Sequence, residues 1–208
     1  LAAHEAAVTA GLAYLEANAG HTRVGRNGVR RMGTSGFVIA QFRHRTARST
    51  RPGERVGDPQ LHSHCAILNR VRGVDGRWRT LDGEAIYRHA HAAGALYAAV
   101  LERELSQQLA VSWVAPVSRV PMRELVSVPG EVIARFSSRR EQVLGHFERL
   151  LAGWTAVHGR SPTRAERAGM LDDAAVRSRS AKRKGSETNL HTHWRAQLTA
   201  GEQTAIDS

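Results

Sequence analysis

The most informative stretch of this sequence is Asp58-Pro59-Gln60-Leu61-His62-Ser63-His64-Cys65-Ala66-Ile67-Leu68. It begins with a rigid, acidic Asp-Pro pair and runs into an apolar segment that is typical of a β-strand. Because alternate side chains of an extended chain share one face, His62 and His64 are expected to point the same way. Two adjacent imidazoles at the start of a strand predict a site for one metal ion or one phosphate group.

A third histidine, His44, ends the segment 36–44, which is apolar on both faces and therefore predicts a buried strand. Residues 45–57 are rich in Arg, Thr, Ser, Gly and Pro and predict a loop. Strand, loop and strand favour an antiparallel pair that brings His44 beside His62 and His64. Three neutral imidazoles leave part of a metal's coordination sphere open, which suits Lewis-acid chemistry better than a closed structural site. A phosphate-binding or purely structural trio is the alternative.

The composition limits the class of partner. The 208 residues carry 30 Lys and Arg against 19 Asp and Glu, a formal charge of +11, which indicates nucleic acid or an anionic membrane surface. The one cysteine, Cys65, excludes an internal disulfide and is expected to be a small core residue facing away from the two histidines. No segment has the apolar length of a membrane span or the pattern of a signal peptide, so we expect a cytoplasmic protein without membrane insertion.

The remaining patterns predict an α/β fold with an antiparallel sheet. Helices are expected over 3–18, over 83–109 with Asp82 as its cap, from 127–129 to 151, and from 161 onward. Strands are expected on either side of 25–28, where Asn-Gly signals a hairpin, and over 37–44, 61–72, 77–81, 110–114 and 123–126.

The character of the chain changes after residue 157. We expect a core over 1–157 and a basic helical extension of the same domain over 158–208. The basic run 177–185 contains Arg179 and Lys182, which either lie against phosphates or form a solvated tail. His191 and His193 repeat the spacing of His62 and His64, but an expected helix turns their rings apart, so no metal site is predicted there.

Several motifs together resemble the MobF, or TrwC-type, conjugative relaxases, which belong to the HUH endonuclease superfamily. They are Phe42-Arg43-His44-Arg45-Thr46-Ala47-Arg48, then Asp58-Pro59-Gln60-Leu61-His62-Ser63-His64, then Asn69, with weaker matches in 75–82, 92–97, 128–130 and 131–140. The resemblance extends over roughly the whole chain. It implies a central antiparallel sheet of about five strands with flanking helices and a C-terminal helical cover over bound DNA.

The resemblance also implies a function: bacterial, metal-dependent nicking and joining of single-stranded DNA at an origin of transfer during conjugation and plasmid mobilization. His44, His62 and His64 would hold one divalent ion, Mg or Mn by analogy, although such sites also take Zn or Ni. Asp58 would orient an imidazole from behind. Arg43, Arg45 and Arg48 surround the site in sequence and are expected to contact phosphates. Implied partners are the hairpin of the origin, a type IV secretion coupling protein and accessory nicking proteins.

The sequence departs from the family in its tyrosines. Such relaxases carry a nucleophilic tyrosine near the N-terminus of the intact protein, whereas this sequence begins Leu1-Ala2-Ala3-His4-Glu5, which resembles a later helix. Tyr14, Tyr87 and Tyr97 fall in helical patterns and match no nucleophile position. We therefore expect an N-terminally truncated relaxase domain that binds DNA but does not nick it alone.

Two other functions stay open. A trihistidine metal hydrolase or oxygenase would need a carboxylate or another water-activating base beside the histidines. A non-catalytic module that binds single-stranded or hairpin DNA would keep the scaffold without the chemistry.

Overall fold

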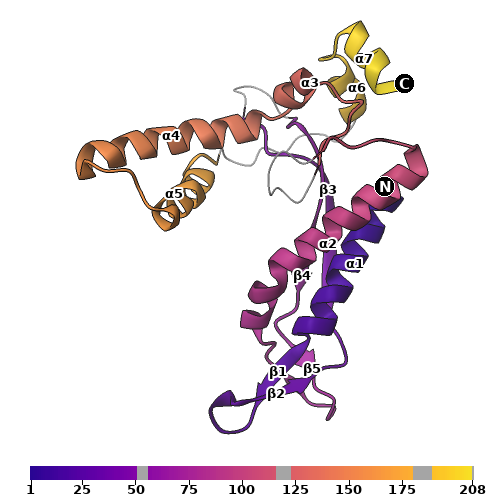
Figure 1. Cartoon of the computed structure of the whole chain (residues 1–208). Coiled ribbons are helices and arrows are strands. Elements are labelled where there is room, and N and C mark those ends of the chain that lie inside the picture. The colour runs from indigo at the N-terminus through magenta and orange to yellow at the C-terminus, as the bar shows by residue number, and fades with distance from the viewer. Residues whose placement is uncertain (51–55, 116–122, 180–188, 208) are drawn as a thin grey trace. The chain divides into compact units, whose positions relative to one another are not determined.

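The computed structural model describes residues 1–50, 56–115, 123–179 and 189–207 (Figure 1). The chain forms two compact units, of which the first comprises Leu1–Arg43 with Ser63–Ser127 and the second His44–His62 with Val128–Ser208. The division crosses two paired strands, between Arg43 and His44 on one and between His62 and Ser63 on the other. The expected boundary after residue 157 stays a prediction.

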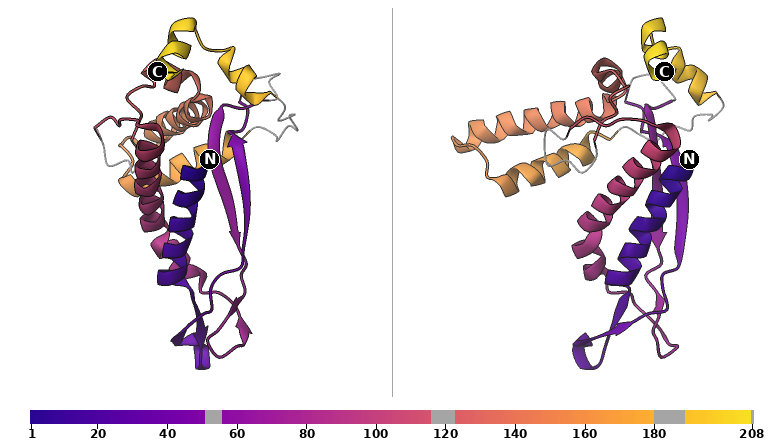
Figure 2. Two further views of the ribbon diagram at one scale, coloured as in Figure 1. Left: turned by 90° about the vertical axis from the view of Figure 1, so that its right-hand side faces the viewer. Right: turned by 45° about the vertical axis from the view of Figure 1, so that its right-hand side comes forward.

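Two helices form the core of the first unit. Helix α1 (Ala2–Ala19) packs along α2 (Gly83–Leu109), and both views of Figure 2 show them side by side. Small side chains line the contact: a Cβ added to Gly11 would lie 3.4 Å from the carbonyl oxygen of Ala93. Close approach therefore depends on Gly and Ala at these positions. Both helices were predicted from their sequence pattern, and both predictions are confirmed.

A hairpin follows α1, as predicted. Strands β1 (His21–Val24) and β2 (Arg30–Gly33) are antiparallel and are joined by the 3₁₀ turn η1 (Arg26–Gly28). In the turn, Asn27 has φ 59° and Gly28 has φ 65°, a left-handed conformation that Asn and Gly tolerate better than other residues. The Asn-Gly pair is therefore the local reason for this hairpin.

A second antiparallel pair, β5 (Val71–Arg72) and β6 (Trp78–Arg79), turns through Asp75 and Gly76. The bridges Thr22↔Leu81 and Thr34↔Gly73 connect this pair to β1 and β2. The prediction of one continuous strand over 61–72 was wrong. The strand ends at Ile67, and the backbone N–H of Leu68 makes a further bond to the carbonyl of Val38. The chain then runs through the exposed Asn69, a residue that is disfavoured in strands.

Strands β3 (Ile39–Thr46) and β4 (Pro59–Ile67) form a long two-stranded antiparallel ribbon, visible in Figure 2. Its outer end is closed by a bond from the Ala47 N–H to the carbonyl of Asp58, 2.8 Å long. The prediction that the segment 36–44 forms a buried strand was wrong about its burial, since Val38, just before β3, and Phe42, within it, are 51% and 55% exposed. A two-stranded ribbon has fewer neighbours than a central strand, and its apolar side chains are only partly covered.

The α/β class with antiparallel pairing is confirmed, but the sheet is smaller than expected. Within the described residues the strands form three two-stranded pairs rather than one sheet of about five strands. The expected strand pair after α2 is reduced to a single bridge, Trp113↔Leu125. The most extensive packing between elements is that of helix α1 on helix α2.

Asp82 differs from its expected role as a side-chain cap of α2. Its carboxylate makes no capping bond and instead accepts a 3.0 Å bond from Arg23, with His21 and Arg31 also within ion-pair range. Burial alone would raise the pKa of Asp82, but the bond to Arg23 and the surrounding positive charges outweigh it and lower the pKa. This buried carboxylate joins β1 and β2 to the start of α2.

The second unit is helical. Its helices are α3 (Gly130–Arg135), α4 (Ser138–His158), α5 (Arg164–Arg177), α6 (Leu190–Arg195) and α7 (Ala200–Asp207). The prediction of one helix from 127–129 to 151 was wrong, because the chain breaks at Phe136 and Ser137. The prediction of a helix start at 161–163 is confirmed, since Thr163 and Glu166 form a reciprocal capping box on α5.

Along the described parts of the chain, every helix is too short or too polar to cross a membrane.

Candidate metal centre

Three histidines from the β3–β4 ribbon form the candidate metal centre. Each of His44, His62 and His64 offers one ring nitrogen, and these three atoms all lie within 4.8 Å of one another. Two nitrogens on the same ion, each about 2.1 Å from it, would be roughly 3–4 Å apart. Only a small contraction would therefore bring all three onto one ion, and the donor set fits a divalent transition metal.

The alternation of the strand and the pairing of the ribbon explain this geometry. His62 and His64 share a face of β4, and the rings of His44 and His62 meet edge to face with centroids 5.2 Å apart. The Nδ1 atom of His62 lies 3.1 Å from the carbonyl oxygen of Gln60. A carbonyl only accepts, so Nδ1 carries the proton and Nε2 keeps its lone pair for a ligand.

The centre is partly open to solvent, because His44 and His62 are half-buried while His64 is exposed. The neighbouring Cys65 is half-buried, and burial raises the pKa of its thiol. A protonated thiol on the other face of the strand is a poor ligand. The ligand set therefore consists of imidazoles, and one side remains accessible to a substrate oxygen.

Asp58 makes a contact that sequence reasoning did not anticipate. Its buried Oδ2 accepts a 2.9 Å bond from the backbone N–H of Ser138 and another from the Ser138 hydroxyl, which in turn accepts from Thr50. A carboxylate at a helix N-terminus is favourable, and this contact explains why α4 begins at Ser138. Orientation of an imidazole by Asp58 stays a prediction.

The predicted DNA-binding arginines have different surroundings. Arg43 is paired with Glu5, and Arg45 is exposed. Arg48 and Arg179 are exposed, and both lie close enough to a third arginine, Arg139, for their charges to act on it. Lys182 lies outside the described residues. The structure thus brings Arg48 and Arg179 near Arg139. In the sequence, Arg48 lies 91 residues before Arg139 and Arg179 lies 40 residues after it.

Arg139 was missed by sequence reasoning. Its guanidinium donates to the carbonyl oxygens of Ser178 and Ala175, at 2.9 and 2.6 Å, and so holds the end of α5 against the start of α4. Burial first, and then the charges of Arg179 and Arg48, lower the pKa of Arg139. The charges of Arg48 and Arg179 both oppose that of Arg139, and an anion bound beside Arg139 would offset this repulsion. We call Arg48, Arg139 and Arg179 the arginine cluster.

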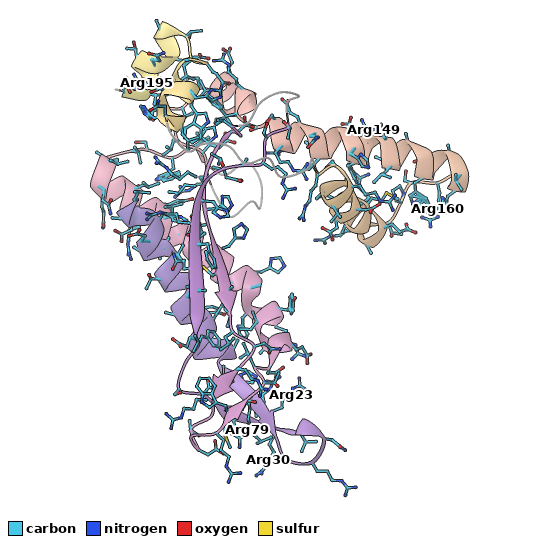
Figure 3. The ribbon with its side chains drawn as sticks, turned by 180° about the vertical axis from the view of Figure 1, so that it is seen from behind. Arg23, Arg30, Arg79, Arg149, Arg160 and Arg195 are labelled. Atoms are coloured by element: carbon cyan, nitrogen blue, oxygen red, sulfur yellow. The ribbon has the colours of Figure 1, made fainter. Side chains whose placement is uncertain are left out.

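A second basic surface lies on the short strands of the first unit. Figure 3 shows Arg23, Arg30 and Arg79 on β1, β2 and β6. Asp82 and Asp75 partly neutralise Arg23 and Arg79, whereas Arg30 is exposed.

The tyrosines are engaged elsewhere or exposed. The hydroxyl of Tyr14 lies 3.1 Å from Nδ1 of His89, and that of Tyr97 lies 2.9 Å from Nδ1 of His4. Tyr87 is 82% exposed on α2. All three belong to the two packed helices of the first unit, as predicted.

Comparisons with known proteins identify the family. The family model described as TrwC relaxase matches residues 1–201. A solved structure of TrwC with a 27-mer DNA comprising the recognition hairpin and the cleavage site is 32% identical, with a TM-score of 0.70, covering 94% of this chain and 63% of that chain. A metal-free complex of TrwC with OriT DNA is 32% identical, with a TM-score of 0.73, covering 98% and 65%. A copper-bound complex is 31% identical, with a TM-score of 0.69, covering 94% and 60%.

The chain therefore spans less than two thirds of each of these solved chains. No curated protein matches it. The family match covers nearly the whole sequence, and the identity to the three solved structures is 31–32%. The chain belongs to the TrwC relaxase family.

Proposed function

We propose that this chain is the metal-binding part of a conjugative relaxase, which nicks and rejoins one DNA strand at an origin of transfer. The observation that carries the proposal is the group of three histidine nitrogens within 4.8 Å on the β3–β4 ribbon. The related structures support it, since they are complexes of the relaxase TrwC with OriT DNA, some of them with metal bound.

The histidines suit the reaction because they are neutral. A divalent ion, when bound, would keep its full charge and offset the negative charge that builds on the non-bridging oxygens of the scissile phosphate. The Gln60 carbonyl holds His62 in the tautomer that presents Nε2 to a ligand. The exposure of His64 leaves one side of the three histidines open. We propose Mg or Mn as the working ion, with Zn or Ni as ions that the same donors accept.

The positive charge suits single-stranded DNA. The chain carries a formal charge of +11, and we propose that Arg43, Arg45, Arg48, Arg179 and Lys182 contact phosphates. The arginine cluster supports Arg48 and Arg179 in this role, because a phosphate would relieve their mutual repulsion with Arg139. We further propose a cytoplasmic bacterial location, with a secretion coupling protein and accessory nicking proteins as partners.

The alternatives predict different surroundings for the histidines. A trihistidine hydrolase needs a carboxylate to activate water, but in the described residues the cluster consists of histidines, and the Asp58 oxygen bonds Ser138. The geometry is also compatible with a non-catalytic DNA-binding module. A test for covalent reaction with DNA distinguishes the two functions.

The test is the reaction of the 208-residue chain with single-stranded oligonucleotides that carry an origin of transfer, in the presence of Mn²⁺. We expect binding without a covalent adduct, because we propose that none of Tyr14, Tyr87 and Tyr97 is the attacking tyrosine. Tyr14 and Tyr97 are bonded within the helix pair, and Tyr87 lies on α2. The intact protein should give a tyrosine-linked adduct on a denaturing gel. An adduct with the chain alone would show that one of its own tyrosines attacks, and no adduct with the intact protein would favour the binding module.

A further inference from the structure

Behind the candidate metal centre, on the other face of β4, lies a buried histidine that the proposed chemistry does not use. His4 on α1 is 3% exposed, and both of its ring nitrogens have partners. Nε2 lies 2.9 Å from the hydroxyl of Ser63 on β4, and Nδ1 lies 2.9 Å from the hydroxyl of Tyr97 on α2. The Tyr97 ring also meets the imidazole edge to face, with centroids 5.8 Å apart. One side chain thus joins two helices to one strand.

The residue that His4 holds separates two of the metal-ligand candidates. Ser63 stands between His62 and His64, and strand alternation sends its side chain to the face opposite theirs. A twist of β4 about its axis, or a slide along it, would move both imidazoles together. The bond from His4 to Ser63 opposes such movement at the point where it matters most for the site.

Glu5, the next residue of α1, makes a similar contact with the other strand, β3. Glu5 pairs with Arg43, and Arg43 directly precedes His44 on β3. Both members of this pair are about half exposed, so the pair contributes less than the buried contact of His4. Two consecutive residues of one helix therefore reach the immediate neighbours of the ligands on both strands of the ribbon.

We propose that His4, through Ser63, is a positioning residue for the metal centre, and that Glu5, through Arg43, assists it. This inference rests on the proposed metal site. Metal ligands need to be held to within about 0.5 Å of the productive geometry by the residues around them. Loss of such supporting contacts typically weakens metal binding by about 10–100-fold.

The experiment is a Co²⁺ titration of the full chain, followed by visible absorption, which reports the geometry of the ligands as well as the affinity. Ser63→Ala removes the hydroxyl that His4 holds, and Ser63→Thr keeps it with a residue that suits a strand. We expect Ser63→Ala to weaken Co²⁺ binding by about tenfold or more and to change the absorption band. Ser63→Thr should stay near the wild type in both. His4→Ala should resemble Ser63→Ala, and the less disruptive serine variant keeps the test valid if His4→Ala does not fold.

Tyr97→Phe is the matched control. It removes a hydroxyl from the same network without breaking a contact to β4, so it should lower the melting temperature while leaving the Co²⁺ affinity within about threefold. If Ser63→Ala binds Co²⁺ as tightly as the wild type with the same absorption band, the inference is overturned and the metal site stands. If the wild type itself binds no Co²⁺ at these histidines, the proposed metal site fails and the inference fails with it.

Discussion

In the intact protein, replacing both His62 and His64 by alanine should lower the rate of DNA cleavage by about a thousandfold or more. Two of the three candidate ligands disappear, and only His44 of this cluster remains. Lewis-acid stabilisation of a phosphoryl transition state contributes several kcal/mol, and about 4 kcal/mol corresponds to three orders of magnitude in rate. The measurement is single-turnover cleavage of a labelled single strand at saturating DNA.

The chain offers a matched control for this substitution. His191 and His193 on α6 have the same spacing, but on a helix their side chains diverge by roughly 200°. Replacing this pair by alanine removes the same number of imidazoles and should leave cleavage within about threefold of the wild type. If both double variants lost the same amount of cleavage activity, the loss caused by replacing His62 and His64 would not be due to a metal site at these residues.

The second large effect concerns DNA affinity and salt. Replacing Arg48 and Arg179 together by alanine should weaken binding of single-stranded DNA by more than about tenfold at low salt. For single strands each lost phosphate contact lowers the slope of log affinity against log salt by about 0.7, so the slope should fall by about 1.4. The measurement is fluorescence anisotropy of a labelled oligonucleotide over a range of NaCl concentrations.

Arg149 provides the comparison for this variant. It lies on α4 about 15 Å along the helix from Arg139, and Figure 3 shows it away from the start of that helix. Arg149→Ala together with Arg160→Ala removes the same charge, and these residues should leave the salt slope nearly unchanged if the phosphates lie at the arginine cluster. Equal effects from both double variants would indicate a diffuse electrostatic attraction and no defined phosphate contact.

Local chemistry explains what the sequence could predict. The Asn27-Gly28 pair adopts the backbone angles that its turn requires, so these two residues were enough to predict the hairpin. The alternation of β4 places His62 and His64 on one face, and the pairing of β3 with β4 brings His44 alongside. The spacing of apolar residues defined both long helices of the first unit. All of these features depend on residues close together in the chain.

The features that were missed depend on distant residues. Asp58 meets Ser138 across 80 positions, and that contact lies at the start of α4, where one continuous helix was expected. Arg139 becomes a candidate phosphate-binding residue only because the charges of Arg48 and Arg179 lie close to it. His4 was also missed, although the sequence contained a signal for it. It lies four and seven residues before Val8 and Gly11, on the buried face of α1, and a histidine on an apolar stripe indicates a polar partner. The identity of that partner, Ser63, required the structure.

The most direct test of the account is the metal stoichiometry and affinity of the purified chain, measured by titration with Mn²⁺ and Co²⁺ beside the His62→Ala, His64→Ala variant. We predict one tightly bound ion per wild-type chain, lost in the variant while its circular dichroism spectrum is retained. Absence of a specific ion in the wild type, or an equally bound ion in the variant, would contradict a metal centre at these histidines and leave a basic DNA-binding module as the better description.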